Sequence, residues 1–108
     1  MIEWYKLASD PSEINFASND LAVVEINGKK ITVARIDKKI FAFAYGCPHA
    51  GAVLAEGHID PLGNIVCPMH RYRYDCRNGR NVSGEGYKLK VWPVELRTEG
   101  VFIGMEPF

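Results

Sequence analysis

The chain has 108 residues, of which 47% are hydrophobic and 24% are charged, a composition typical of a folded globular protein rather than a disordered one. This length supports one hydrophobic core, so we expect a single domain over residues 1–108. Thirteen basic residues balance thirteen acidic ones and no apolar run is long enough to cross a bilayer, so neither nucleic acid nor a membrane is an expected partner and a cytoplasmic location is predicted.

The first half of the chain predicts an antiparallel meander. The stretch LAVVEI leads into Asn27-Gly28, a pair favoured in two-residue hairpin turns because both residues tolerate positive φ, and KKITVARID continues in alternation. KKIFAFAYG then alternates as a further strand, which would place Ile40, Ala42 and Ala44 on one face and Phe41, Phe43 and Tyr45 on the other.

The second half of the chain predicts an insertion followed by more strands. From about residue 46 to residue 86 the pattern breaks into short pieces bounded by turn signals such as PLGN and RNG. GYKLKVWPVELRTEGVFIGM returns to alternation, with a corner at residues 98–100 and with Pro93 tolerated only at an edge or bulge. We therefore expect an all-β antiparallel domain with an inserted loop-rich subdomain.

Two cysteine and histidine pairs stand in the inserted segment. AYGCPHAGAVL holds Cys47 and His49, and CPMHRYRYD holds Cys67 and His70. Two thiolates and two imidazoles form a ligand set that either zinc or an iron-sulfur cluster accepts. Two loops that each supply one sulfur and one nitrogen can clamp a two-iron cluster, with both thiolates on one iron and both imidazoles on the other.

One further cysteine and one further histidine remain. Cys76 is expected to be a free, half-buried thiol, and His58 is expected to be a solvated surface group.

The two quoted segments resemble the Rieske motif. The resemblance extends beyond the four ligands to neighbouring residues: Gly51, Leu54, Pro68, Tyr74, Asp75, Asn78 and Gly79. With the flanking strand pattern, it covers the whole chain. The resemblance implies a Rieske-like antiparallel β-sandwich or partial barrel with one 2Fe-2S cluster at the tips of two loops of the subdomain. It also implies that Cys47 and Cys67 bind the inner iron, and that His49 and His70 bind the outer iron. No catalytic residue is expected, because four protein ligands leave no open coordination position.

Mixed ligation sets an expectation for the reduction potential. Two ferric ions, two sulfides and two thiolates sum to zero charge, so reduction is easier than in a four-cysteine cluster, at about −150 to +300 mV against about −400 mV. The resemblance favours the low part of this range. High-potential relatives carry cysteines where this chain has Ala52 and Met69, and a serine where it has Tyr72. Tyr74, in contrast, stands where those relatives direct a tyrosine hydroxyl toward a cysteine sulfur.

The resemblance implies a ferredoxin that passes one electron from a ferredoxin reductase to a terminal oxygenase, an electron-transfer component rather than an enzyme on its own. The chain is too short to add a catalytic mononuclear iron domain. The surface near His49, His70 and Arg71 is the expected contact for a transient redox partner. Two alternatives stay open: the small subunit of an assimilatory nitrite reductase, bound to its large subunit, and a zinc-stabilised binding module without redox function.

Overall fold

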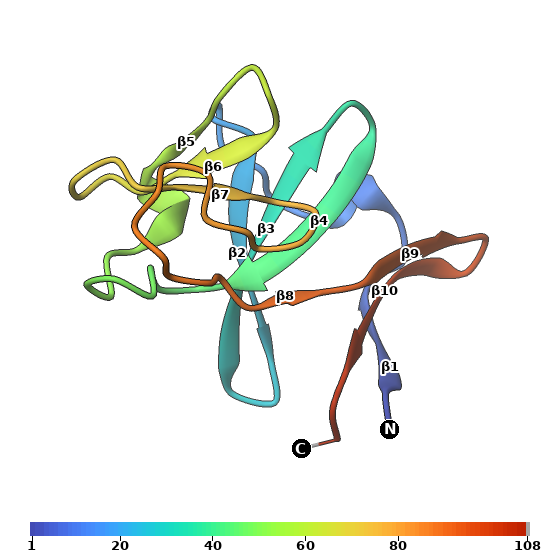
Figure 1. The fold of residues 1–108 in the computed structure, drawn as a ribbon. Coiled ribbons are helices and arrows are strands. Elements are labelled where there is room, and N and C mark those ends of the chain that lie inside the picture. Colours follow the sequence, from blue (N-terminus) through green and yellow to red (C-terminus); the bar gives the residue numbers. More distant parts are fainter. Residues whose placement is uncertain (108) are drawn as a thin grey trace.

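The computed structural model describes residues 1–107 and consists of three antiparallel sheets with two short 3-10 helices (Figure 1). The all-β prediction is confirmed. Within the described residues, neither helix has the length or the apolar character that a membrane span requires.

Two sheets form the base of the molecule (Figure 1). The first has the strand order β2 (Leu21–Ile26), β3 (Lys29–Ile36), β4 (Lys39–Ala44) and β8 (Val91–Trp92). The second has the order β1 (Glu3–Ala8), β10 (Gly100–Met105) and β9 (Val94–Arg97). The helix η1 (Pro11–Glu13) lies between β1 and β2 in the sequence. The chain passes from one sheet to the other at Pro93, which separates β8 from β9, as its exclusion from a strand interior predicts.

Three tight turns connect the base strands. Asn27 and Gly28 turn between β2 and β3 at φ values of +48° and +83°, which confirms the predicted hairpin. Asp37 and Lys38 make the next turn, also at positive φ, although a lysine in that conformation is uncommon. The predicted corner at residues 98–100 joins β9 to β10.

The third sheet belongs to the inserted subdomain, which is less irregular than predicted. It contains β5 (His58–Ile59), β6 (Asn64–Val66) and β7 (Arg73–Asp75) in that order, preceded by the helix η2 (Leu54–Glu56). The strands are only two or three residues long, so they leave little periodicity for a sequence pattern to reveal.

Two hydrophobic clusters lie on opposite faces of the first base sheet. Ile40 and Ala42 of β4 belong to the cluster between the two base sheets, whereas Phe41 and Phe43 belong to the cluster under the subdomain. The predicted alternation of β4 is confirmed from Ile40 to Phe43, and both of its faces are covered. The prediction for Ala44 is wrong, because this last residue of the strand packs against the cluster under the subdomain. This strand delivers the chain directly into the first cysteine and histidine pair.

Candidate metal centre

Two loops of the subdomain carry the cysteine and histidine pairs. The first follows β4, and backbone hydrogen bonds from Cys47 N to Ala52 O and from Gly51 N to Cys47 O close it at 2.8 Å each. Gly51 turns this loop at φ +72°, where a side chain would be strained. The second loop joins β6 to β7, and a hydrogen bond of 2.8 Å from Cys67 N to Tyr72 O closes it.

Backbone strain marks the tip of the second loop. His70 and Arg71 both have positive φ, at +65° and +58°, a conformation that costs a residue with a side chain about 1–2 kcal/mol. Such strain persists where the surrounding structure imposes it and gathers at functional sites. In this loop conformation the His70 side chain is exposed at the surface.

The loops bring the four predicted side chains together in two pairs. The thiols of Cys47 and Cys67 are buried, with exposed fractions of 3% and 0%, and belong to the same hydrophobic cluster. The rings of His49 and His70 lie nearer the surface, with their centroids 5.1 Å apart. Within residues 1–107, no three cysteine, histidine or acidic side chains converge as ligands of one ion.

One imidazole nitrogen indicates that this arrangement accommodates a metal group. His49 Nδ1 is the only buried side-chain nitrogen or oxygen in residues 1–107 that lacks a hydrogen-bond partner. Such an atom costs free energy unless something else contacts it. Two thiols in the interior and two imidazoles nearer the surface suit the sulfur and nitrogen ligation of a 2Fe-2S cluster.

The thiols have unequal electrostatic environments. Burial raises the pKa of Cys47, but hydrogen bonds from Tyr74 and from the backbone amides of His49 and Ala50 outweigh it, so that this pKa lies below its ordinary value. Burial holds the pKa of Cys67 above its ordinary value. The Tyr74 hydroxyl lies 3.5 Å from Cys47 Sγ, which confirms the tyrosine-to-sulfur contact that the resemblance implies.

Two residues differ from the sequence-based expectations. Cys76 is fully buried rather than half-buried, and burial raises its pKa to about 12, so it is an inert thiol in the core. Tyr87, which sequence reasoning missed, places its ring 5.5 Å from that of His49. Its only sequence signal is that it is the one aromatic residue in the SGEGYK stretch. His58 is exposed, as predicted.

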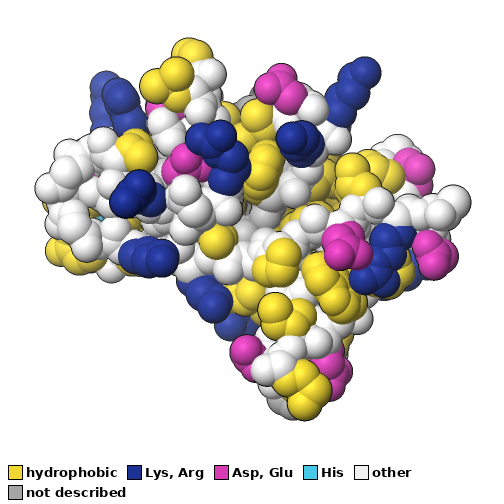
Figure 2. Space-filling view, turned by 45° about the vertical axis from the view of Figure 1, so that its right-hand side comes forward, with side chains coloured by type: hydrophobic (Ala, Val, Ile, Leu, Met, Phe, Trp, Pro, Cys, Tyr) yellow, Lys and Arg dark blue, Asp and Glu magenta, His cyan; other side chains and the backbone are white. Residues whose placement is uncertain are grey.

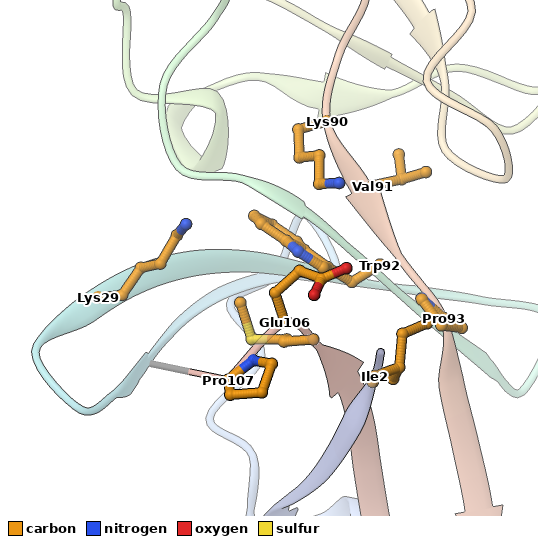
Figure 3. A pocket seen from close by; sticks show the side chains of 10 residues that line it. Ile2, Lys29, Lys90, Val91, Trp92, Pro93, Glu106 and Pro107 are labelled. Carbon is orange, nitrogen blue, oxygen red and sulfur yellow. The ribbon is translucent and has the colours of Figure 1, made fainter.

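A groove of about 620 Å³ lies away from this site, between β8 and the ends of β1 and β10 (Figure 3). Trp92 lines it, with the ammonium groups of Lys29 and Lys90 at 5.1 and 5.9 Å from the ring centroid. No cysteine or histidine lines this groove, so it is separate from the two ligand pairs.

Comparison with known proteins identifies the family. Residues 3–93 match the Rieske [2Fe-2S] domain. The chain belongs to the Rieske family. Its cofactor is accordingly a Rieske 2Fe-2S cluster, which confirms the cluster and decides against the zinc-stabilised module.

Similar sequences include ferredoxin components of oxygenase systems. The chain is 30% identical, over 81% of its length and 84% of the relative's, to the ferredoxin component of the naphthalene 1,2-dioxygenase/salicylate 5-hydroxylase systems of a Ralstonia species. It is 23% identical, over 82% of its length and 72% of the relative's, to the ferredoxin component of the alkene monooxygenase system of Xanthobacter autotrophicus.

Solved structures share the fold. A chain in the complex of reduced oxygenase and oxidized ferredoxin of carbazole 1,9a-dioxygenase has a TM-score of 0.76 at 25% identity, with 93% of this chain and 91% of that one covered. A nitrite reductase small subunit from Mycobacterium tuberculosis, described as putative and NADH-dependent, has a TM-score of 0.80 at 17% identity, with 100% and 99% covered. An identity this low shows the fold alone, so it lends the nitrite reductase alternative no functional support.

Proposed function

We propose that Cys47, Cys67, His49 and His70 are the four cluster ligands and that the chain carries one electron from a ferredoxin reductase to a terminal oxygenase. The observation that carries this proposal is the buried thiol pair beneath a pair of rings, one of which has an orphaned nitrogen. The subdomain of about residues 46–86 would hold the cluster, and the reducing cytoplasm would keep the thiols free to bind iron.

Each part of the site has a defined task. When bound, a Rieske cluster accepts and releases one electron. Cys47 and Cys67 would anchor the group in the interior, and the histidine rings would hold it nearer the surface, where a partner approaches. The Tyr74 hydroxyl lies 3.5 Å from Cys47 Sγ, and it would donate a hydrogen bond to that sulfur as a cluster-bound thiolate and stabilise the negative charge that reduction adds.

The charge distribution supports a partner with an acidic surface. Residues 71–90 contain six lysines and arginines but only two acidic residues, while the rest of the chain contains seven basic and eleven acidic residues. Asp75 is paired with Arg77 at 2.8 Å, and Glu85 accepts a hydrogen bond from Asn81, so both carboxylates are engaged. Figure 2 shows lysine and arginine side chains on the left of the view and also at its upper right and right.

The exposed cations of this segment extend the expected contact around His70 and Arg71. They are Arg71, Arg73, Arg77, Arg80, Lys88 and Lys90. In the relatives named above, an oxygenase belongs to the same system as the ferredoxin, and the proposed partner of this chain is likewise an oxygenase whose docking surface carries carboxylates. A small, transient contact is sufficient for electron transfer.

The ligand assignment is tested with two buried cysteines. We compare Cys67→Ala with Cys76→Ala, because both thiols are fully buried and only the first is a proposed ligand. Iron, acid-labile sulfide and the electron paramagnetic resonance spectrum after dithionite reduction are measured on each purified protein. Wild type and Cys76→Ala should show equal iron and sulfide and a spectrum of mixed nitrogen and sulfur ligation, and Cys67→Ala should show neither. A wild-type protein without acid-labile sulfide after anaerobic reconstitution would refute the proposal.

A further inference from the structure

The two histidine rings lie in different surroundings. The Tyr72 ring centroid is 4.3 Å from that of His49 with an interplanar angle of 34°, whereas it is 6.3 Å from that of His70. The centroid of the Tyr87 ring lies 5.5 Å from that of His49, with an interplanar angle of 60°. His49 is partly buried and His70 is exposed. The tyrosines therefore pack on one imidazole and leave the other largely uncovered.

The tyrosines also support each other. Tyr72 and Tyr87 stack at 6.0 Å with an interplanar angle of 29°, although Tyr72 belongs to the second ligand loop and Tyr87 to a separate loop beyond β7. Aromatic pairs in this range of separations attract beyond the apolar area they bury. The stack thus joins two loops across the face of His49.

Asn81 fixes the loop that presents Tyr87. Its side-chain oxygen accepts hydrogen bonds from the backbone amides of Glu85 and Gly86, at 2.6 and 3.2 Å. Its side-chain amide donates to Glu85 Oε1 at 2.9 Å and to the backbone oxygen of Arg73 at 3.2 Å. One side chain therefore ties both ends of this loop to β7, which holds Tyr87 in place although 42% of its surface is exposed.

We propose that Tyr72 and Tyr87 cover the imidazole of His49, so that His70 is the ring through which the redox partner makes contact. This inference rests on the proposed function and assigns the two ligand histidines different tasks. His49 is shielded from the partner by the tyrosine rings, and His70 is exposed and contacts the partner. Arg71, next to His70 and exposed, then provides the docking charge beside the contact ring.

Covalent labelling of the histidines in the cluster-loaded protein tests the cover. Diethyl pyrocarbonate transfers an ethoxycarbonyl group to a free imidazole nitrogen and releases ethanol and carbon dioxide, and mass spectrometry of peptides gives a rate for each histidine. The chain has only three histidines, and His58, exposed on β5, is an internal reference. We expect His70 to react faster than His49, and we expect Tyr87→Ala to raise the rate at His49 by about three- to tenfold, from the usual strength of one aromatic pair. The rate at His58 should not change.

Two further variants separate a cover from a general loosening. Tyr87→Phe keeps the ring and should keep His49 protected, whereas Asn81→Ala keeps both tyrosines but releases their loop and should expose His49. Equal rates at His49 and His70 in the wild type, or no increase at His49 in Tyr87→Ala, would overturn the inference. The resonance spectrum is recorded on the same samples: its absence contradicts the proposed function, and its presence with equal labelling contradicts only the cover.

Discussion

In the base, aliphatic side chains such as Ile31, Val33 and Ile103 fill the space between two sheets, and backbone ladders satisfy most polar groups. In the subdomain, the buried positions include three thiols, two of them proposed ligands, and the hydroxyl-bearing ring of Tyr74. The base is thus specified by an alternating apolar pattern, while the subdomain depends on groups whose proposed partner is a metal cluster.

The loops repeat this contrast. The base turns are short hairpins, whereas in each of two subdomain loops a single polar side chain makes several hydrogen bonds to the backbone. Asp60 accepts hydrogen bonds from the backbone amides of Leu62 and Asn64, both at 2.9 Å, and Asn81 holds the loop of Tyr87. A region built on local polar contacts and a cofactor can be altered without unfolding the rest, which is the difference that the following predictions test.

Removal of the iron should have the largest effect, and it should be confined to one region. Metal binding contributes directly to folding free energy, so the cluster-free protein should lose order in the subdomain while the base persists. Hydrogen exchange followed by mass spectrometry should show rapid exchange in β6 and β7 and continued protection in β2, β3 and β4. Equal loss of protection in both regions would contradict this separation.

Truncation of a side chain in the base core should lower the stability of the protein and leave the cluster unaffected. Ile103→Ala removes a fully buried side chain and should lower the free energy of unfolding by about 2–5 kcal/mol. The resonance spectrum of the reduced cluster should stay the same, because Ile103 belongs to the other hydrophobic cluster. Leu96→Ala, at an exposed position of β9, is the control and should change stability little. An altered spectrum in Ile103→Ala would show that the regions are coupled.

Two glycines test how tightly the subdomain is packed. A Cβ at Gly79 would lie 1.9 Å from the backbone oxygen of Leu89, whereas a Cβ at Gly63 would meet nothing within 4 Å, although both residues have positive φ. Gly63→Ala should cost about 1–2 kcal/mol from the backbone conformation alone. Gly79→Ala should cost about 3 kcal/mol or more because backbone atoms must also move. Denaturant unfolding of the two cluster-loaded variants measures the difference, and equal costs would rule out the close approach.

Loss of the Tyr74 hydroxyl should have the smallest effect and should appear only in the cluster. Tyr74→Phe removes the hydrogen bond to Cys47 Sγ, so the reduced form loses stabilisation and the reduction potential should fall by about 40 mV, equivalent to about 1 kcal/mol for one electron. Protein-film voltammetry measures the shift. Tyr5→Phe in the base should leave the potential unchanged, and a potential that does not fall in Tyr74→Phe would remove this hydroxyl from the tuning of the cluster.

Sequence patterns predicted the parts of the molecule that depend on local signals. The Asn27-Gly28 hairpin, the two-faced strand β4 and the grouping of the two cysteine and histidine pairs follow from turn chemistry, alternation and ligand spacing. The ligand assignment itself stays a prediction until the cysteine variants are measured.

Other parts depend on long-range contacts that leave no local signal. The pairing of β1 with β10 joins the two ends of the chain, from Glu3 opposite Met105 onward, and no pattern within either strand specifies it. The position of Tyr87 beside His49 likewise depends on how Asn81 folds a distant loop. The predicted meander places a turn at Asp37 and Lys38, but its positive φ at both residues leaves no signal because neither residue is a glycine.

The uneven distribution of charge has a consequence for how this molecule meets its partner. Because the chain has no net charge, an acidic surface at a distance exerts little overall pull on it. The excess of basic residues over positions 71–90 and of acidic residues in the rest of the chain nevertheless gives the molecule a dipole moment, so the same field would exert a torque that turns the subdomain toward the acidic surface before collision. Added salt, by shortening the range of that torque, should lower the fraction of encounters that arrive correctly oriented more than the number of encounters.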